Sequence, residues 1–155
     1  MFREMRRKDR KIKNDEAFKI LKNSTYGILS TISENGYPYG IPINFILFND
    51  SIYFHSALEG HKIDNIAKNS KVSFCVVGQN QVLSKEFSTK YESVIIFGKA
   101  VNVSDDDEKN KILLEILNKY SPDYIKEGKE YIKNASKATK IIKINIEHIS
   151  GKSNK

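Results

Sequence analysis

The sequence predicts a mainly β (α+β) fold, in which about six antiparallel strands form a small barrel or sandwich with helices at its periphery. Short runs rich in β-branched and aromatic residues recur along the chain, and tight-turn signals separate several of them. Neither a GxGxxG motif nor a βαβ rhythm occurs, which argues against a parallel nucleotide-binding sheet. The length of 155 residues suits a single domain spanning residues 1–155.

The first half of the chain predicts one helix and a three-stranded meander. Residues 14–24 place their apolar side chains on one face of an amphipathic helix. Asn35-Gly36 is a strong hairpin signal because both positions tolerate positive φ, and Asn49-Asp50 predicts a second tight turn. The expected strands are residues 26–32, 37–48 and 52–55.

Two prolines restrict the strand at residues 37–48. Pro38 and Pro42 have no backbone N–H and would remove ladder bonds from a central strand. We therefore expect this strand at an edge of the sheet, at a bulge, or facing something other than a neighbouring strand.

The second half predicts a short helix from about Gly60, a loop at 79–91, and a β-bulge at Gly98. Residues 105–135 form a helical addition, in which 105–120 is the clearest helix of the chain. The acids that begin this helix, Asp105 to Glu108, are interpreted as helix N-terminal charge and not as metal ligands. The remaining expected strands are residues 71–77, 92–103 and 138–150.

The formal net charge of +7 is concentrated at the two ends of the chain, where residues 1–13 form a basic arm. Basic ends can contact nucleic acid, but no nucleic-acid-binding motif accompanies them, so we favour a solvated lysine-rich surface. No apolar run is long enough for a membrane span, and the N-terminus lacks the apolar region of a signal peptide. We therefore expect a cytoplasmic protein. Cys75 lies in an apolar run and is expected to be a buried structural thiol.

The segment "YFHSALEGHKI" (53–63) carries the strongest functional signal. A helix start presents unpaired N–H groups and a partial positive charge, which favour an anion. Ser56 can donate a hydroxyl hydrogen bond, Gly60 allows close approach to the backbone, and Lys62 supplies a cation. The segment therefore predicts a phosphate site. The alternative is that His55 ends a strand, His61 caps a helix and Lys62 is solvated.

Other catalytic or metal chemistry has little support. His55 and His61 do not have the spacing of a zinc site, and no cysteine or carboxylate set completes one, so we expect no metal. No GxSxG motif occurs, and linear spacing identifies no Ser-His-Asp set.

The order of the segments "MRRKDR", "TYGILSTISENGYPYGIPINF", "IYFHSALEGHKIDNI", "KVSFCVVG" and "ESVIIFGKA" resembles the flavin-binding split-barrel superfamily related to pyridoxamine 5′-phosphate oxidase. Within it, the chain is similar to the nitroimidazole-resistance (Nim) branch. The resemblance implies a six-stranded antiparallel split β-barrel with peripheral helices. It also implies a homodimer that binds FMN at the subunit interface.

The resemblance assigns roles to particular residues. The backbone of one strand is expected to lie along the isoalloxazine ring, and a second segment is expected to hold the FMN phosphate. Ser93 takes the place of a glutamine that reaches the flavin in the oxidases. The ring-side residues are Ile41, Pro42, Ile43 and Asn44, and the phosphate-side residues are His55, Ser56, His61 and Lys62.

The implied function is an FMN-dependent oxidoreductase that passes electrons from a reduced nicotinamide or another donor to a small molecule such as a nitro compound. His55 would be the catalytic proton donor, or it would only pack or bind the phosphate. His61 stands where the oxidases have an arginine, and their C-terminal Trp and Arg have no counterpart, so oxidation of pyridoxamine phosphate is not expected. Arg6 and Arg7 lie near the ligand or form plain surface charge.

The alternative function is a non-catalytic split-barrel protein that binds flavin or haem. The candidate haem ligands are His55, His61 and His148.

Overall fold

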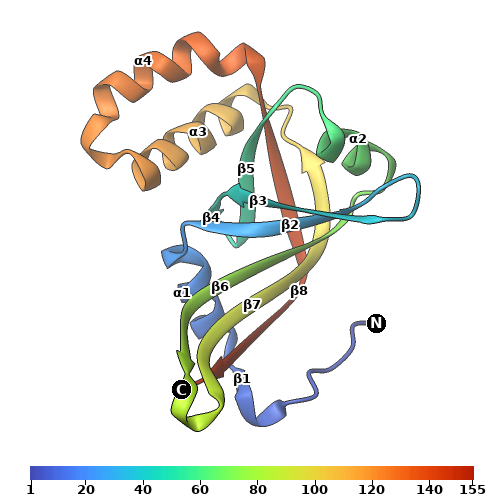
Figure 1. The fold of residues 1–155 in the computed structure, drawn as a ribbon. Helices are drawn as coiled ribbons and strands as arrows, with labels where there is room; N and C mark the ends of the chain where they lie inside the picture. The colour runs from blue at the N-terminus through green and yellow to red at the C-terminus, as the bar shows by residue number, and fades with distance from the viewer.

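The structure is a computed structural model that describes residues 1–155. One antiparallel sheet, curled into a half-barrel, runs through it (Figure 1), with the strand order β3-β2-β6-β7-β8-β5-β4 and with β1 paired to β8. The strands are β1 (Lys11–Ile12), β2 (Tyr26–Ile32), β3 (Pro38–Asn44), β4 (Ile46–Phe48), β5 (Ser51–Ala57), β6 (Lys71–Leu83), β7 (Ser88–Asn102) and β8 (Thr139–Asn154).

Four helices lie around this sheet. The first packs beside the lower part of the sheet, the second follows β5 near the β2–β3 hairpin, and the last two project to one side as a helical hairpin (Figure 1). None of them combines the length and the hydropathy that a membrane span requires. The helices are α1 (Asn14–Asn23), α2 (His61–Lys68), α3 (Asp106–Tyr120) and α4 (Ile125–Ala135).

The predicted split-barrel α+β fold is confirmed. The six expected strands are present, and the structure adds two short ones, β1 and β4. Strand β4 arises because the expected strand at 37–48 breaks at Phe45. The edge prediction for Pro38 and Pro42 is also confirmed, because β3 pairs with β2 alone and its other edge is free.

The prediction of a loop at 79–91 is wrong, because β6 and β7 continue through this region as one long hairpin. Their pairing extends from Lys71↔Lys99 to Leu83↔Ser88, with an irregularity between Val77 and Asn80. Most side chains of the extension are exposed, so polar residues occupy both faces and no alternating apolar pattern marks the strands.

Apolar side chains from alternate strand positions form the main core, inside the curled sheet. Phe45, Phe54 and Phe74 are fully buried there, together with α1 residues such as Leu21. Cys75 was expected to be buried in this core, but it is only half-buried on the outer face of β6. Its partial burial raises the pKa of the thiol, which makes it a weak nucleophile.

A β-bulge at Gly98 was expected, and the bulge lies opposite this residue, in β8. Phe97 pairs with His148 and Gly98 pairs with Ile146, so Glu147 is the extra residue. A Cβ at position 98 would lie 2.2 Å from the backbone oxygen of Asn145. Only glycine fits the close approach of the two strands at this point.

We expect Gly98→Ala to lower the free energy of unfolding by about 1–3 kcal/mol, because the added methyl group overpacks a rigid backbone. Gly40→Ala is the matched control, since a Cβ there would meet its nearest neighbour at 3.4 Å. That control should stay within about 0.5 kcal/mol of the parent. Urea denaturation measures both, and equal midpoints for the two variants would contradict the packing argument.

Candidate functional site

A small polar network holds the start of α2 on the β2–β3 hairpin. Asn65 is buried and donates from Nδ2 to Thr31 Oγ1 at 2.9 Å and to Ser33 Oγ at 3.2 Å. His61 Nε2 lies 3.1 Å from the same Ser33 hydroxyl, and its ring packs on Tyr39 with the centroids 4.0 Å apart. The predicted phosphate residue His61 is therefore anchored to the hairpin. Linear sequence offered no signal for Ser33 or Asn65.

The N-terminal end of α2 is open to a ligand. Its N-cap, Gly60, has φ 147, a conformation that side-chain-bearing residues rarely adopt. A Cβ at this position would meet no atom within 4 Å, so the space beside the helix start is free. Ser56 is less available, because it is buried and its hydroxyl donates to the carbonyl of Ala57 at 3.0 Å.

His55 and Lys62 form the charged part of the site. The side chain of His55 reaches the surface near the end of β5, but neighbouring atoms cover part of its ring. This partial burial is the larger cause that lowers the pKa of the imidazole, and the positive charge of Lys62 is the smaller one. Lys62 is half-buried in the first turn of α2, and none of the four ion pairs of the chain involves it. The pair thus combines a neutral imidazole with an unpaired cation near neutral pH.

One cavity brings His55 together with the predicted ring-side strand. It has a volume of about 500 Å³ and is lined by Tyr26, Pro42, Ile43, Asn44 and His55. Pro42 and Asn44 are exposed on β3, whose free edge lies open beside them. Tyr26 had not been singled out in the sequence, because a single exposed tyrosine at the start of a strand carries no signal.

The phosphate-side residues Ser56, His61 and Lys62 do not line this cavity, and neither do two of the residues predicted to lie at the flavin ring. Ile41 packs its side chain against the main core, so only its backbone could face a ligand on β3. Ser93 pairs with Val77 on β6, and two strands separate it from β3. At about 4.8 Å per strand spacing, Ser93 is roughly 14 Å from the ring-side strand within one protomer.

The basic arm and His148 also lie elsewhere. Arg7 forms an ion pair with Asp9 at 2.6 Å, which raises the pKa of the guanidinium and lowers the pKa of the carboxyl group to about 2. His148 stacks on Phe2 and Phe97, with centroid distances of 4.9 and 6.3 Å. None of these residues lines the cavity of His55.

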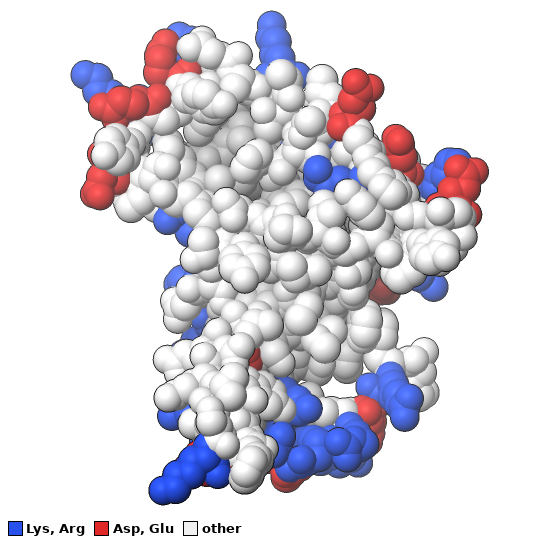
Figure 2. Space-filling view, in the orientation of Figure 1, with Lys and Arg blue, Asp and Glu red and all other residues white.

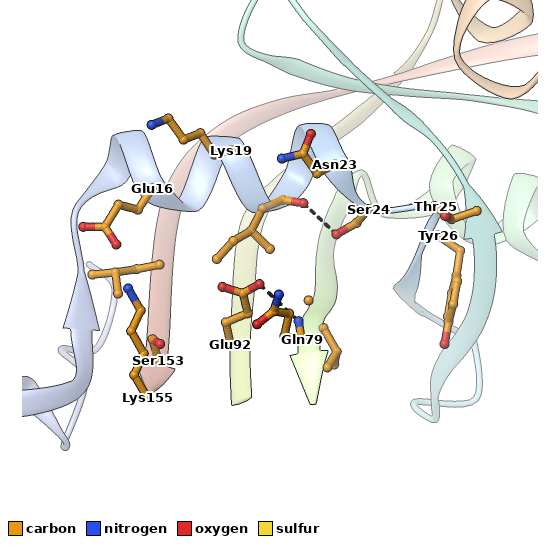
Figure 3. A pocket seen from close by; sticks show the side chains of 14 residues that line it. Glu16, Lys19, Asn23, Ser24, Thr25, Tyr26, Gln79, Glu92, Ser153 and Lys155 are labelled. Carbon is orange, nitrogen blue, oxygen red and sulfur yellow. Dashed lines mark hydrogen bonds between the residues drawn. The ribbon is translucent and has the colours of Figure 1, made fainter. Parts of the chain in front are cut away.

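Another cavity, of about 690 Å³, lies between α1 and the part of the sheet that contains Gln79 of β6, Glu92 of β7 and Ser153 of β8 (Figure 3). Its charged residues have both signs, with Glu16 and Glu92 against Lys19 and Lys155. The carboxylate of Glu92 already accepts the backbone N–H of Gln79 at 3.1 Å. This cavity contains none of the predicted site residues and offers no concentrated charge for a ligand.

The arrangement around His55 fits a planar molecule that carries a phosphate. An open helix start and the unpaired Lys62 suit the anion, while the free edge of β3 presents backbone groups to a ring system. The chain contains no group of three or more His, Cys, Asp or Glu residues placed to hold a metal ion.

Comparisons with known proteins found several solved structures with a similar fold. A candidate 5-nitroimidazole antibiotic resistance protein from Bacteroides thetaiotaomicron is 26% identical, with a TM-score of 0.79 over 92% of this chain and 85% of that one. A conserved hypothetical protein from Mycobacterium tuberculosis is 17% identical, with a TM-score of 0.84 and coverage of 97% and 90%. A protein from Mycobacterium smegmatis described as binding FAD and heme is 19% identical, with a TM-score of 0.80 and coverage of 92% and 72%.

No curated protein matches the sequence. The family described as "Pyridoxamine 5'-phosphate oxidase" matches residues 13–153, which is nearly the whole chain. The chain therefore belongs to the pyridoxamine 5′-phosphate oxidase family of flavin-binding split barrels.

Proposed function

We propose that the protein is an FMN-dependent oxidoreductase that reduces a small molecule, such as a nitro compound. The observation that carries this proposal is the single cavity in which the free-edge strand β3 meets His55, next to the unpaired Lys62. The bound flavin would supply the two-electron chemistry. The chain would bind and orient it.

The phosphate of FMN would lie at the start of α2. Lys62 and the first N–H groups of the helix would hold it, with His61 positioned by Ser33 at one side. The ring would lie along Ile41 to Asn44, where the backbone of an edge strand has unpaired groups to offer.

His55 would donate a hydrogen bond or a proton to the reacting molecule. Its pKa is lowered in the free protein, so the ring is mainly neutral near pH 7. A phosphate dianion bound at Lys62 would oppose the charge of that lysine and raise the pKa of His55 again. Cofactor binding would thus help to prepare the proton donor.

The complete site would need two copies of the chain. The outer face of the sheet carries exposed apolar side chains, and Ile28, Cys75 and Ile95 form one cross-strand row on it. The middle of the face in Figure 2 has few charged atoms, which suits an interface. In a homodimer that buries this row, Ser93 of the partner subunit could approach the flavin.

A non-catalytic flavin- or haem-binding protein is the second candidate. One relative is described as binding FAD and heme, and another as a flavocytochrome. Of the three histidines, His55 is the one that is exposed and lines a cavity while making no hydrogen bond to another side chain. A Soret band that appears on haem addition and is lost in His55→Ala would favour this candidate.

Lys62→Ala should weaken FMN binding by roughly 10- to 100-fold, because a charge-assisted phosphate contact contributes about 1.5–3 kcal/mol. Riboflavin lacks the phosphate, so its affinity should hardly change. Flavin fluorescence titration measures both. Lys68→Ala is the matched control, since Lys68 lies on the same helix but pairs with Glu34 at 2.7 Å. Undiminished FMN affinity in Lys62→Ala would refute the phosphate assignment.

The pKa of His55 should rise in Lys62→Ala, because a neighbouring positive charge is removed. It should remain below the ordinary value of 6.5, since partial burial is the larger cause of the shift. An NMR titration of the imidazole C–H signals measures the value, with Lys68→Ala expected to match the parent. The same pKa in all three proteins would show that Lys62 does not act on His55.

Ile95→Lys should convert the homodimer to monomers, because it places a charge at the centre of the apolar row. Ile95 is 41% exposed in one protomer, so the substitution should leave the fold intact. Light scattering after gel filtration measures the mass. Leu58→Lys, at another exposed apolar residue away from the sheet face, should stay dimeric. A dimeric Ile95→Lys would place the interface elsewhere.

A further inference from the structure

A second cavity lies on the other side of His55, between α3 and α4. Its volume is about 560 Å³, and its walls come from the two helices, the turn that joins them and the start of β8. His55 lines both this cavity and the one on β3. A molecule in the second cavity would therefore reach the edge of the proposed flavin site at one shared side chain.

The cavity exists because α4 does not pack tightly on its neighbours. No residue of α4 is buried, and Tyr131 remains 74% exposed. The two helices are in close contact at Gly128, where a Cβ would lie 2.1 Å from a methyl carbon of Leu117. The apolar face of α4 is thereby left open toward His55. The residues of α4 that line the cavity on this face are three or four positions apart, Gly128, Tyr131, Ile132 and Ala135, and Tyr124 continues the face just before the helix.

The charges of the lining restrict the class of ligand. Glu127 is the one carboxylate in the cavity wall, and no lysine or arginine lines it, although the chain has a net charge of +7. The lysines of α4, such as Lys129 and Lys133, lie outside the lining. His55 adds no positive charge near neutral pH, because its pKa is lowered. Lys62, whose charge acts on His55, lies outside the lining, and the Lys109 ammonium already donates to the carbonyl of Ser136 at 2.6 Å. An anion in the cavity would therefore lose its hydration without a cation in the lining as its partner.

We infer that this cavity binds an uncharged or cationic aromatic molecule, presents it to His55 and rejects anions. Tyrosine rings suit aromatic stacking and cation–π contact, and Glu127 would favour a positive charge at the rim. The idea that this molecule is the electron acceptor rests on the proposed function. The binding itself does not require a flavin.

The test uses three ligands with the same ring and different charges: 2-naphthalenemethanol, 2-naphthylmethylamine and 2-naphthoate. Each is titrated into the flavin-free protein and followed by amide chemical shifts. The alcohol and the amine should shift the signals of Gly128 and Ala135, with 2-naphthoate at least tenfold weaker. The inference would be overturned if 2-naphthoate bound as tightly as the alcohol and the amine. It would also be overturned if the ligands shifted only the amide signals of the residues next to Pro42 on β3.

Ala135→Trp should fill the cavity and abolish binding of the alcohol, whereas Lys133→Trp, outside the lining on the same helix, should bind it normally. Ser121→Trp repeats the test from the opposite wall if the first variant does not fold. If a folded Ala135→Trp or Ser121→Trp protein still bound the alcohol normally, the ligand would not lie in this cavity and the inference would be wrong. If this face instead packs against another copy of the chain, none of the ligands binds and Ala135→Trp disrupts the dimer, which also overturns it.

Failure of the proposed function would look different. If the protein took up no FMN, the ligand series could still bind between α3 and α4. If FMN bound normally and the series did not, only the present inference would fail.

Discussion

The break in the sheet at Phe45 connects the parts of this molecule. Phe45 lies between β3 and β4, so its backbone groups have no ladder partner, and side chains of α3 satisfy them. The Tyr120 hydroxyl oxygen accepts the Phe45 N–H at 2.9 Å, while Lys119 Nζ donates to its carbonyl at 2.9 Å. Burial lowers the pKa of Lys119 to about 8, and the ammonium lies 4.2 Å from the centre of the Phe45 ring.

This contact links the helical hairpin to the ring-side strand. The C-terminal turn of α3 fixes the chain one residue after Asn44, which lines the cavity on β3. Two residues of the same helix end, Leu117 and Tyr120, line the cavity toward α4. The same helix end therefore anchors the strand beside one cavity and lines the other, so the helical addition supports the site that the barrel begins.

Local patterns predicted the parts of the structure that bury one face. Alternating apolar and polar residues predicted β8, and Pro38 and Pro42 indicated the free edge. The extension of β6 and β7 was missed because both of its faces meet solvent, so burial left no mark on the sequence. The candidate site was also only partly predictable from the sequence. Segment 53–63 was recognisable, but its link from His61 through Ser33 depends on residues 28 positions apart.

The prolines of β3 have one further effect. A free strand edge is a template on which a strand of another molecule can add, and such pairing leads to aggregates. Pro38 and Pro42 lie four residues apart, so their nitrogen atoms point to the same side of the strand. Two missing N–H groups along this open edge deprive an incoming strand of hydrogen bonds. The feature that leaves backbone exposed for a ligand thus also protects the folded protein against unwanted β-sheet growth.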